Sequence, residues 1–309
     1  MTSLLVVGMP NSGKSTFIAA LRHLLVADEV AIDLCSIELS ESEGHLNRLE
    51  NRWLDCEEME RTKPATEGWV ELKVQDKRTY AHLTLRIPDL RGEAFEQPAC
   101  IGQCDADLFD ALADADGILL FTNADREDDA LLIDDLLDLL GPDILDANEP
   151  ESPPEEDSET INTLSNGSEV APAGEDAENA FKPEEMPEEV KLVEFLQVAN
   201  RRPLSSRRRK IAIIISAWDV VGTNVKGDGI TAELWFATRR PMLSQFIEAN
   251  SDLWDTRVYG VSAQGGRLPE DKSALEKVRV PSKRIRIVGH GAAEHDLSAP
   301  LRWMLPLAD

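Results

Sequence analysis

The feature that most constrains this chain is a glycine-rich loop near its start, Gly8-Met9-Pro10-Asn11-Ser12-Gly13-Lys14-Ser15. It matches the pattern G-x-x-x-x-G-K-[S/T], in which backbone N–H groups surround a phosphate. The apolar run Leu4–Val7 before it predicts a buried strand, and apolar residues at helical spacing follow it at Phe17, Leu21 and Leu24. A strand, a phosphate-binding loop and a helix in this order predict an α/β fold that holds phosphate at the helix N-terminus.

Seven residues of this region are predicted to contact a bound nucleotide: Gly8, Asn11, Ser12, Gly13, Lys14, Ser15 and Thr16. Lys14 can reach the β and γ phosphates, so we expect it to contribute to catalysis as well as to binding. The Ser15 hydroxyl is expected to ligate Mg²⁺. The loop alone does not distinguish ATP from GTP.

The rest of the chain alternates between predicted strands and helices. Short apolar runs indicate further buried strands at Leu83–Ile87, Ile118–Phe121, Ile211–Ile215 and Arg257–Val261. Trp69–Val74 alternates apolar and polar residues, which favours an antiparallel pairing with the Leu83 run through a turn near Asp76–Arg78. This order predicts a doubly wound, mostly parallel sheet with one antiparallel strand and helices on both faces.

Apolar residues also recur at helical spacing, which predicts further core-facing helices. The four sets are Leu46, Leu49 and Trp53; Leu132, Leu136 and Leu139; Val190, Val193 and Leu196; and Leu234, Met242 and Phe246.

An acidic stretch interrupts the alternation. Between Asp143 and Glu189 the chain has 16 acidic residues and one basic residue, Lys182, a net −15 within a total of −26. Such a segment buries too little apolar surface to offset its ordering entropy. We therefore predict a disordered acidic insertion over residues 147–186, within a single domain made of residues 1–146 and 187–309.

The charge balance excludes several classes of function. A net charge of −26 disfavours nucleic acid and anionic membranes as partners, because both attract basic surfaces. No apolar run approaches the ~18–20 residues of a membrane span, and Leu4–Val7 lacks the basic region of a signal peptide. Four cysteines in so long a chain are no disulfide framework, which favours the cytoplasm. The basic cluster Arg201-Arg202 and Arg207–Lys210 has two interpretations, pairing with the acidic insertion and nucleic-acid binding, and the second lacks interleaved aromatic residues and opposes the net charge.

Polar residues follow the Leu83–Ile87 strand. Asp89 lies at the predicted carboxyl end of this strand, and Gly92 follows three residues later. A carboxylate at such a strand end can hold Mg²⁺ through water, and the Gly92 N–H can donate to the γ-phosphate. We predict Asp89 as a metal residue and Gly92 as a phosphate-binding residue.

Two later strands lead into Ser216-Ala217-Trp218-Asp219 and Ser262-Ala263-Gln264-Gly265. With these segments the chain resembles the translation-factor-related class of P-loop GTPases, whose fourth box is usually Asn/Thr-Lys-x-Asp and whose fifth is Ser-Ala-x. The resemblance implies that GTP or GDP binds with Mg²⁺. Asp219 would accept hydrogen bonds from guanine N1 and the exocyclic amine. In the fifth box, which contains Ser262 and Ala263, the backbone N–H of Ala263 would donate to guanine O6. Adenine has an amino group at that position and cannot accept this hydrogen bond.

The fourth box departs from the usual pattern, because Ala217 stands where lysine is usual. The lysine stem normally covers one face of the base. Trp218 is a candidate to replace it by stacking, and ordinary packing at a strand end is the alternative.

The switch residues of such a GTPase have candidates here as well. The resemblance implies a threonine that ligates Mg²⁺ and senses the γ-phosphate, and both Thr66 and Thr62 precede the Trp69 strand. Thr66 has the more usual spacing to Asp89. Glu93 follows Gly92 and could hold the attacking water, or else serve in a switch-loop salt bridge or a helix cap.

The closer resemblance is to the bacterial double-GTPase group of this class. It is carried by Arg-Thr-x-Pro-x-Thr at residues 61–66, Asp-x-x-Gly-Glu at 89–93 and the segment Asp296–Trp303. It implies a Mg²⁺-dependent GTPase that acts as a switch in multi-protein bacterial conflict systems, including defence, with partners bound through the switch loops or the acidic insertion. The alternatives are an adaptor gated by GTP or GDP with little hydrolysis, and a P-loop ATPase.

Overall fold

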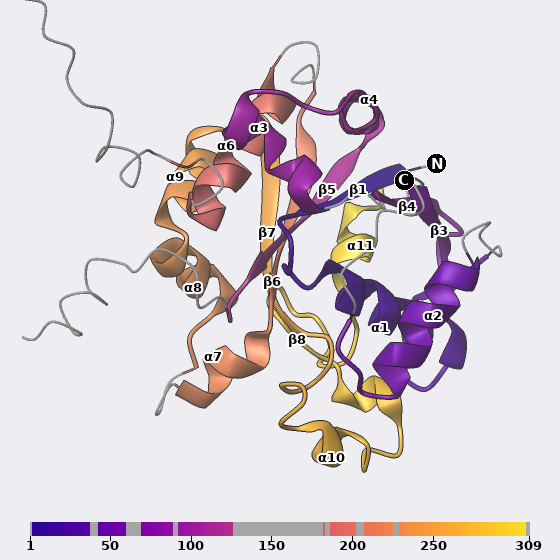
Figure 1. Ribbon diagram of the computed structural model, residues 1–309. Coiled ribbons are helices and arrows are strands. Elements are labelled where there is room, and N and C mark those ends of the chain that lie inside the picture. Colours follow the sequence, from indigo (N-terminus) through magenta and orange to yellow (C-terminus); the bar gives the residue numbers. More distant parts are fainter. Residues whose placement is uncertain are drawn as a thin grey trace, which may run out of the picture.

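The computed structural model describes residues 2–37, 43–59, 69–88, 92–125, 182, 186–201, 207–224 and 229–306. Its centre is one eight-stranded sheet with the order β2-β3-β4-β1-β5-β6-β7-β8 (Figure 1). The strands are β1 (Thr2–Gly8), β2 (Leu34–Ser36), β3 (Trp69–Asp76), β4 (His82–Pro88), β5 (Gly117–Asn123), β6 (Arg209–Ser216), β7 (Trp254–Ser262) and β8 (Arg286–Val288). The mixed α/β class predicted from the sequence is confirmed.

Helices connect these strands. The α-helices are α1 (Lys14–Ala27), α2 (Glu43–Leu54), α3 (Gln97–Ile101), α4 (Ala106–Asp114), α6 (Glu188–Asn200), α7 (Trp218–Asn224), α8 (Ala232–Arg239), α9 (Pro241–Ala249), α10 (Lys272–Leu275) and α11 (Ala299–Met304). Two 3-10 helices, η1 (Gly92–Phe95) and η5 (Pro281–Arg284), complete the described elements.

The sheet is parallel through its centre. β1 pairs in parallel with β4 and β5, and β5, β6 and β7 continue in parallel. β3 runs antiparallel to β4, as its alternating pattern predicts. A second antiparallel strand, β8, pairs with β7 at the far edge, beyond the single one expected. β2 and β8 have three residues each, too short to leave an apolar run in the sequence.

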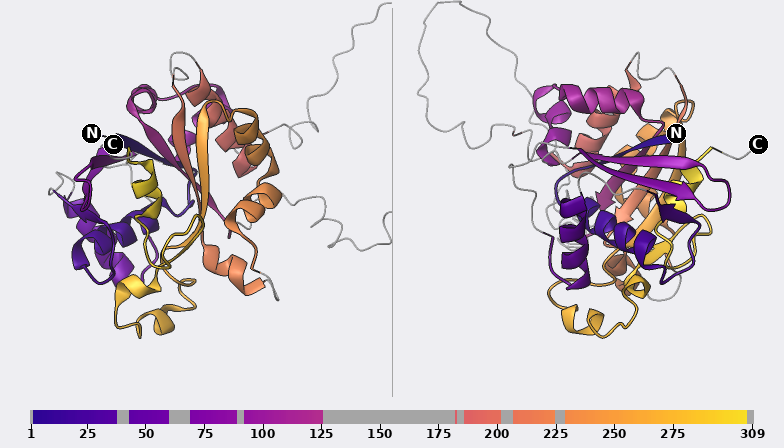
Figure 2. Two further views of the ribbon diagram at one scale, coloured as in Figure 1. Left: turned by 180° about the vertical axis from the view of Figure 1, so that it is seen from behind. Right: turned by 90° about the vertical axis from the view of Figure 1, so that its right-hand side faces the viewer.

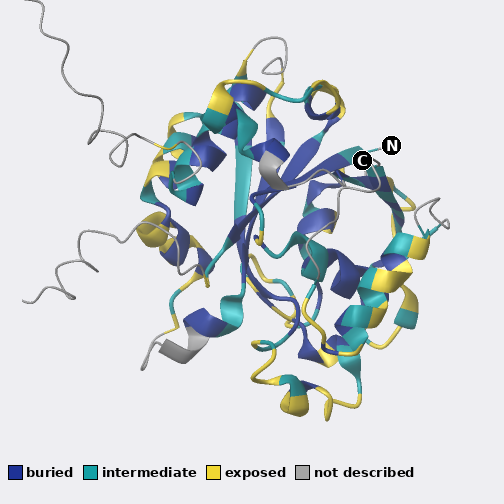
Figure 3. Ribbon diagram, in the orientation of Figure 1, coloured by how far each residue is buried: buried dark blue, intermediate teal, exposed yellow. Residues whose placement is uncertain are grey.

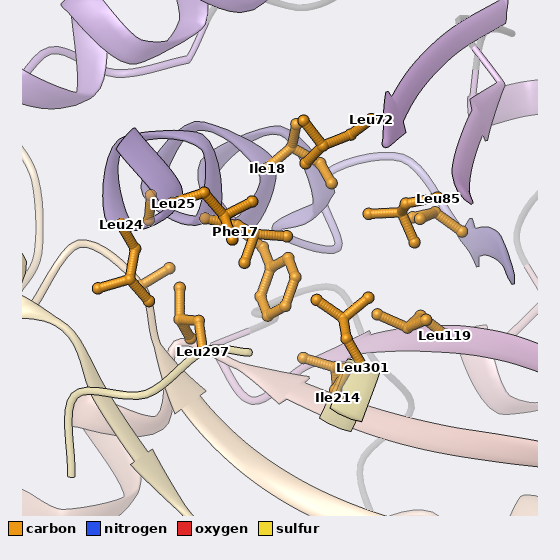
Figure 4. Packing of buried hydrophobic residues seen from close by; sticks show 14 of the residues in the cluster. Phe17, Ile18, Leu24, Leu25, Leu72, Leu85, Leu119, Ile214, Leu297 and Leu301 are labelled. Carbon is orange, nitrogen blue, oxygen red and sulfur yellow. The ribbon is translucent and has the colours of Figure 1, made fainter. Parts of the chain in front are cut away.

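Helices lie on both sides of the sheet (Figure 2), and side chains of β1 alternate between two cores. Leu4 and Val6 of β1 face a core covered by α1, α2 and α11, which Figure 4 shows in part. Leu5 and Val7 face the opposite core, which α4, α6, α8 and α9 cover. Figure 3 shows the strands buried and the outward helix faces exposed. Both faces of the sheet are therefore sealed, which leaves its carboxyl edge for a ligand.

One predicted apolar stripe is wrong. Leu234 and Met242 are 54% and 47% exposed, so they do not form the core face expected with Phe246. Pro241 begins a new helix, α9, and the helical phase restarts there. Trp235 and Leu243 are the residues buried instead.

The basic run before β6 belongs to the fold. Arg209 donates to Leu112 O and Ala199 O, both at 2.8 Å, and is 4% exposed. Arg207 pairs with Asp116 at 2.8 Å, and Lys210 donates to Trp303 O at 2.7 Å. These contacts tie the run to the fold, while its predicted pairing with the acidic insertion involves residues outside the described ones and stays a prediction.

Several predicted features lie outside the described residues. They include the Leu132–Leu139 helix and most of the acidic insertion, so the domain boundaries at 147 and 186 stay predictions. None of the helices in the described parts of the chain has the length and apolar character needed to cross a bilayer.

His23 links α1 to its neighbours and gives stability a pH dependence. Its Nδ1 lies 3.0 Å from Glu50 Oε1 and its Nε2 lies 3.3 Å from Glu29 Oε2. Burial opposes protonation, but the hydrogen bonds and charges of Glu50 and Glu29 outweigh it and raise the pKa of His23 above 6.5. The charged imidazole therefore stabilises the fold fully below pH 6.5, and this contribution is lost as pH rises through the raised pKa.

We expect the His23→Gln variant to lack this dependence. The melting temperature of the native chain should exceed that of the variant by more at pH 6 than at pH 8.5. Each kcal/mol corresponds to about 2–4 °C in a chain of this size. Thermal melting at both pH values measures the difference, and an equal gap at the two would refute the charged link.

Candidate functional site

The phosphate-binding loop is closed by its own lysine. Lys14 Nζ donates to Gly8 O at 2.6 Å, Met9 O at 2.7 Å and Ser12 Oγ at 3.2 Å. The ammonium therefore bridges the two ends of the loop at the N-terminus of α1, where Lys14 is the first helical residue. Ser15, beside it in the first turn, is half-buried. This arrangement places a cation and helix N–H groups where a phosphate binds.

Two glycines of the loop are required by close contacts. A Cβ on Gly8 would lie 2.6 Å from Ser12 Oγ and 2.8 Å from Phe121 Cβ. Gly13 has a φ of +85°, and its Cβ would lie 2.6 Å from the Cβ of Ser216. The loop is thus packed directly against the ends of β5 and β6.

A cavity of about 510 Å³ opens beside this loop, at the carboxyl ends of β5, β6 and β7. Its lining comes from the loop and α1, from the ends of the three strands and from the segments after them. The polar lining residues are Asn11, Thr16, Asn123, Asp125, Ser216, Asp219, Gln264, Arg267 and Glu270. A cavity of this size at the carboxyl edge, next to a phosphate site, suits a nucleoside.

Hydrogen bonds join the segments around the cavity. Asn123 Nδ2 at the end of β5 donates to Asn11 O of the loop at 2.9 Å. Ser216 O at the end of β6 accepts from the Ala124 N–H at 3.0 Å. Arg240 holds the carboxyl end of β5 in place, because its Nη2 donates to Asn123 O at 2.9 Å.

The two segments expected to read the base meet in this cavity. Asp219 Oδ1 accepts from the Ser262 hydroxyl at 2.5 Å, and Ser262 Oγ accepts from the Gly265 N–H at 3.1 Å. Both Asp219 and Ala263 line the cavity. A carboxylate held in place by the neighbouring loop is arranged to accept from a donor edge, as guanine presents.

Trp218 lies elsewhere. Its indole packs on Gly260 of β7, where an added Cβ would come within 2.3 Å of the ring, and meets Trp235 edge-on at a centroid distance of 6.3 Å. Trp218 is not one of the described residues that line the cavity. This placement favours packing over the predicted stacking on a base.

Gly260→Ala tests how the Trp218 packing positions Asp219. The new methyl group collides with the indole, so the start of α7 must shift and carry the adjacent Asp219 with it. We expect guanine-nucleotide affinity to fall by about 10-fold or more, in the range of a 1–3 kcal/mol overpacking cost. Calorimetric titration with GDP measures it.

Gly260→Ala combined with Trp218→Ala serves as the control, since it removes the collision and should recover most of the affinity. Equal affinity of Gly260→Ala and the native chain would show that Asp219 does not depend on this packing.

The fifth box is supported from outside by the end of α2. Trp53 Nε1 donates to Ala263 O at 2.9 Å, and Gln264 Nε2 donates to Trp53 O at 3.4 Å. The Arg284 guanidinium lies 4.2 Å from the Trp53 ring centroid and donates to Trp53 O at 3.2 Å. Trp53 is fully buried, so the loop that carries Ala263 rests on a fixed base.

Sequence reasoning missed several lining residues: Asn123, Asp125, Gln264, Arg267 and Glu270. A usable signal existed for the first two, because they directly follow the predicted strand Ile118–Phe121, and carboxyl ends of parallel strands meet at one edge. The same signal existed for Gln264, which follows the predicted strand Arg257–Val261, whereas Arg267 and Glu270 depend on the course of the loop after β7, for which the sequence holds no comparable signal.

The predicted switch residues are only partly described. Thr62, Thr66 and Asp89 lie outside the described residues, as does the Glu93 side chain. Gly92 begins η1, and Phe95 at its end lies under the loop, with Lys14 Nζ 5.6 Å from the ring centroid. In the described part of the chain no three His, Cys, Asp or Glu side chains gather into a metal-binding cluster.

The loop, the strand order and the cavity define a P-loop nucleotide-binding protein. A comparison with protein families then narrows the class, because residues 5–304 match the model of Double-GTPase 1. The chain belongs to this family, which supports guanine-nucleotide binding.

Two other comparisons add context. One solved structure that is similar is the S. cerevisiae Ski7 GTPase-like domain, bound to GTP, with 14% identity and a TM-score of 0.39. The match covers 86% of this chain and 43% of that one, so this chain spans less than half the length of that relative. A comparison with curated proteins finds no match.

Proposed function

We propose that this protein is a Mg²⁺-dependent GTPase that cycles between GTP and GDP and acts as a switch for partner proteins in the bacterial cytoplasm. The observation that carries the proposal is that Asp219, hydrogen-bonded to Ser262, lines a cavity that Asn11 and Gly13 of the phosphate-binding loop also line. A carboxylate facing the base edge selects a base with two adjacent donors, and guanine is the purine with that edge. Family membership supports the same assignment.

The chain's own residues suit the chemistry that this activity needs. Lys14 and the loop N–H groups would neutralise charge on the transferred phosphoryl group, and Mg²⁺ would add its charge there. The proposed protein ligands of Mg²⁺ are Ser15 and Thr66, with Asp89 acting through water. Ser15 suits this role, since it is half-buried and directly follows Lys14 in the first turn of α1.

Base selectivity tests the proposal directly. The affinities of the purified chain for GTP, GDP and ATP, measured by calorimetry with Mg²⁺ at fixed salt, should favour guanine by at least about 10²-fold, equivalent to ~2.7 kcal/mol. Equal or tighter binding of ATP would overturn the assignment and support the P-loop ATPase alternative.

Hydrolysis is a separate step of the proposal. We assign Glu93 to holding the attacking water, and we expect slow turnover that a partner accelerates, because GTPases of this kind depend on added cationic groups. Multiple-turnover phosphate release measures it. Tight guanine binding without phosphate release, alone or with partners, would support the adaptor alternative instead. We assign partner binding to the switch segments and the acidic insertion, and no role in nucleic-acid or membrane binding.

A further inference from the structure

The fourth box supplies no long side chain to the lining of the cavity. Ala217 lines the cavity, and its methyl group lacks the length to cover a purine ring. Its φ of +53° turns the backbone at this point. The neighbouring Trp218 packs on Gly260 of β7, as described above. Any cation that covers the base therefore comes from another segment.

Arg267, in the loop after β7, brings a cation to the cavity. It lines the cavity, and its Nη2 lies 2.9 Å from Oδ1 of Asp125, which follows β5. β6 lies between β5 and β7 in the sheet, and Ala217 follows β6. The ion pair thus joins the segments after β5 and β7, whose strands are two strand spacings, about 10 Å, apart, and Ala217 follows the strand between them.

The loop that carries Arg267 is fixed by its own contacts. The Arg267 N–H donates to Asp271 Oδ2 at 2.9 Å. Gly266 approaches the same carboxylate closely, since a Cβ there would lie 2.8 Å from it. The backbone is held while the guanidinium stays accessible, with the Arg267 side chain 55% exposed and that of Asp125 40% exposed. An ion pair this exposed adds little stability, so the guanidinium can turn onto a ligand at small cost.

We propose that Arg267, oriented across the cavity by Asp125, covers the face of the bound guanine and replaces the missing fourth-box lysine. This inference rests on the proposed function. A planar guanidinium stacks on an aromatic ring and adds cation–π attraction, which a lysine stem provides less well. Arg267 acts on the face of the base, whereas Asp219 reads its edge.

Arg267→Ala tests the inference, with Arg279→Ala as the matched control, because Arg279 is exposed and does not line the cavity. We expect Arg267→Ala to weaken GDP binding about tenfold, equivalent to about 1.4 kcal/mol. The affinity of this variant for inosine diphosphate, which lacks the exocyclic amine, should fall by the same factor. Its affinity for inorganic tripolyphosphate should equal that of the native chain. Arg279→Ala should match the native chain for all three probes.

Asp125→Asn tests the positioning role. This change should weaken GDP binding less than Arg267→Ala does. The double variant should bind GDP as tightly as Arg267→Ala alone, because both substitutions disrupt the same ion pair between Arg267 and Asp125. Additive effects would show that Asp125 does not act through Arg267.

The outcomes separate this inference from the proposed function. If the native chain binds no guanine nucleotide, the proposed function fails and this inference fails with it. If the native chain binds GDP and Arg267→Ala binds it equally well, only the role of Arg267 is overturned. A loss of tripolyphosphate binding equal to the loss of GDP binding would overturn it too, by placing Arg267 at the phosphates.

Discussion

Replacement of Lys14 by alanine is expected to reduce the affinity for GTP and GDP by roughly 30- to 5,000-fold, or about 2–5 kcal/mol. This is the usual effect of removing one partner of a desolvated charge pair. The loss has two sources, since Lys14 is expected to contact the bound phosphates and bridges Gly8 O, Met9 O and Ser12 Oγ. Calorimetric titration of the variant with each nucleotide measures it.

Lys14→Arg separates the two sources. It keeps the charge but cannot reproduce a compact ammonium between two carbonyls, so affinity should recover in part only. Circular dichroism of both variants checks that the fold is retained. Native-like GDP affinity in Lys14→Ala would show that the loop does not bind phosphate.

Asp219→Asn is expected to change which base binds rather than only how tightly. An amide presents one donor and one acceptor, so it pairs poorly with the two donors of guanine and well with xanthine, whose C2 carries an oxygen. We expect GDP affinity to fall by about 10²-fold or more and xanthosine diphosphate to become the preferred ligand. Competition between the two diphosphates on native and variant chains measures the exchange.

Ser262→Ala provides the companion measurement. Ser262 donates to Asp219 Oδ1, so its loss loosens the carboxylate without changing its chemistry. Affinity should fall for GDP while the preference for guanine over xanthine remains. A switch to xanthine by this variant, or none by Asp219→Asn, would contradict the assignment of Asp219 to the base edge.

The sheet was predictable where the strands carry their own signal. β5 and β6 are buried on both faces, so Ile118–Phe121 and Ile211–Ile215 read as continuous apolar runs. β8 was not predictable, because Arg286–Val288 is a strand only through its pairing with β7. The restart of the helical phase at Pro241 was visible in the sequence, and a single stripe across it was the wrong interpretation.

For the candidate site, the sequence predicted the segments better than the side-chain directions. The structure brings Asp219 and Ser262 together, because Asp219 follows β6, Ser262 ends β7, and these two parallel strands are neighbours. The direction of Trp218 depends on the space above Gly260, one strand away, which is a tertiary contact. The ion pair of Arg267 with Asp125 joins residues that are 142 positions apart, and no local pattern indicates it.

The contact between Trp53 and Ala263 has a consequence for signalling. The end of α2 contacts the loop that carries Ala263 through the Trp53 hydrogen bond. The last residue of α2 is Leu54, and both Thr62 and Thr66 follow it within twelve residues. A partner that binds the outward face of α2 (Figure 3) and shifts Trp53 would change the guanine affinity. Thermodynamic reciprocity then requires that the nucleotide change the affinity for this partner by the same factor. A single helix would thus couple the occupant of the base site to binding on the outer surface.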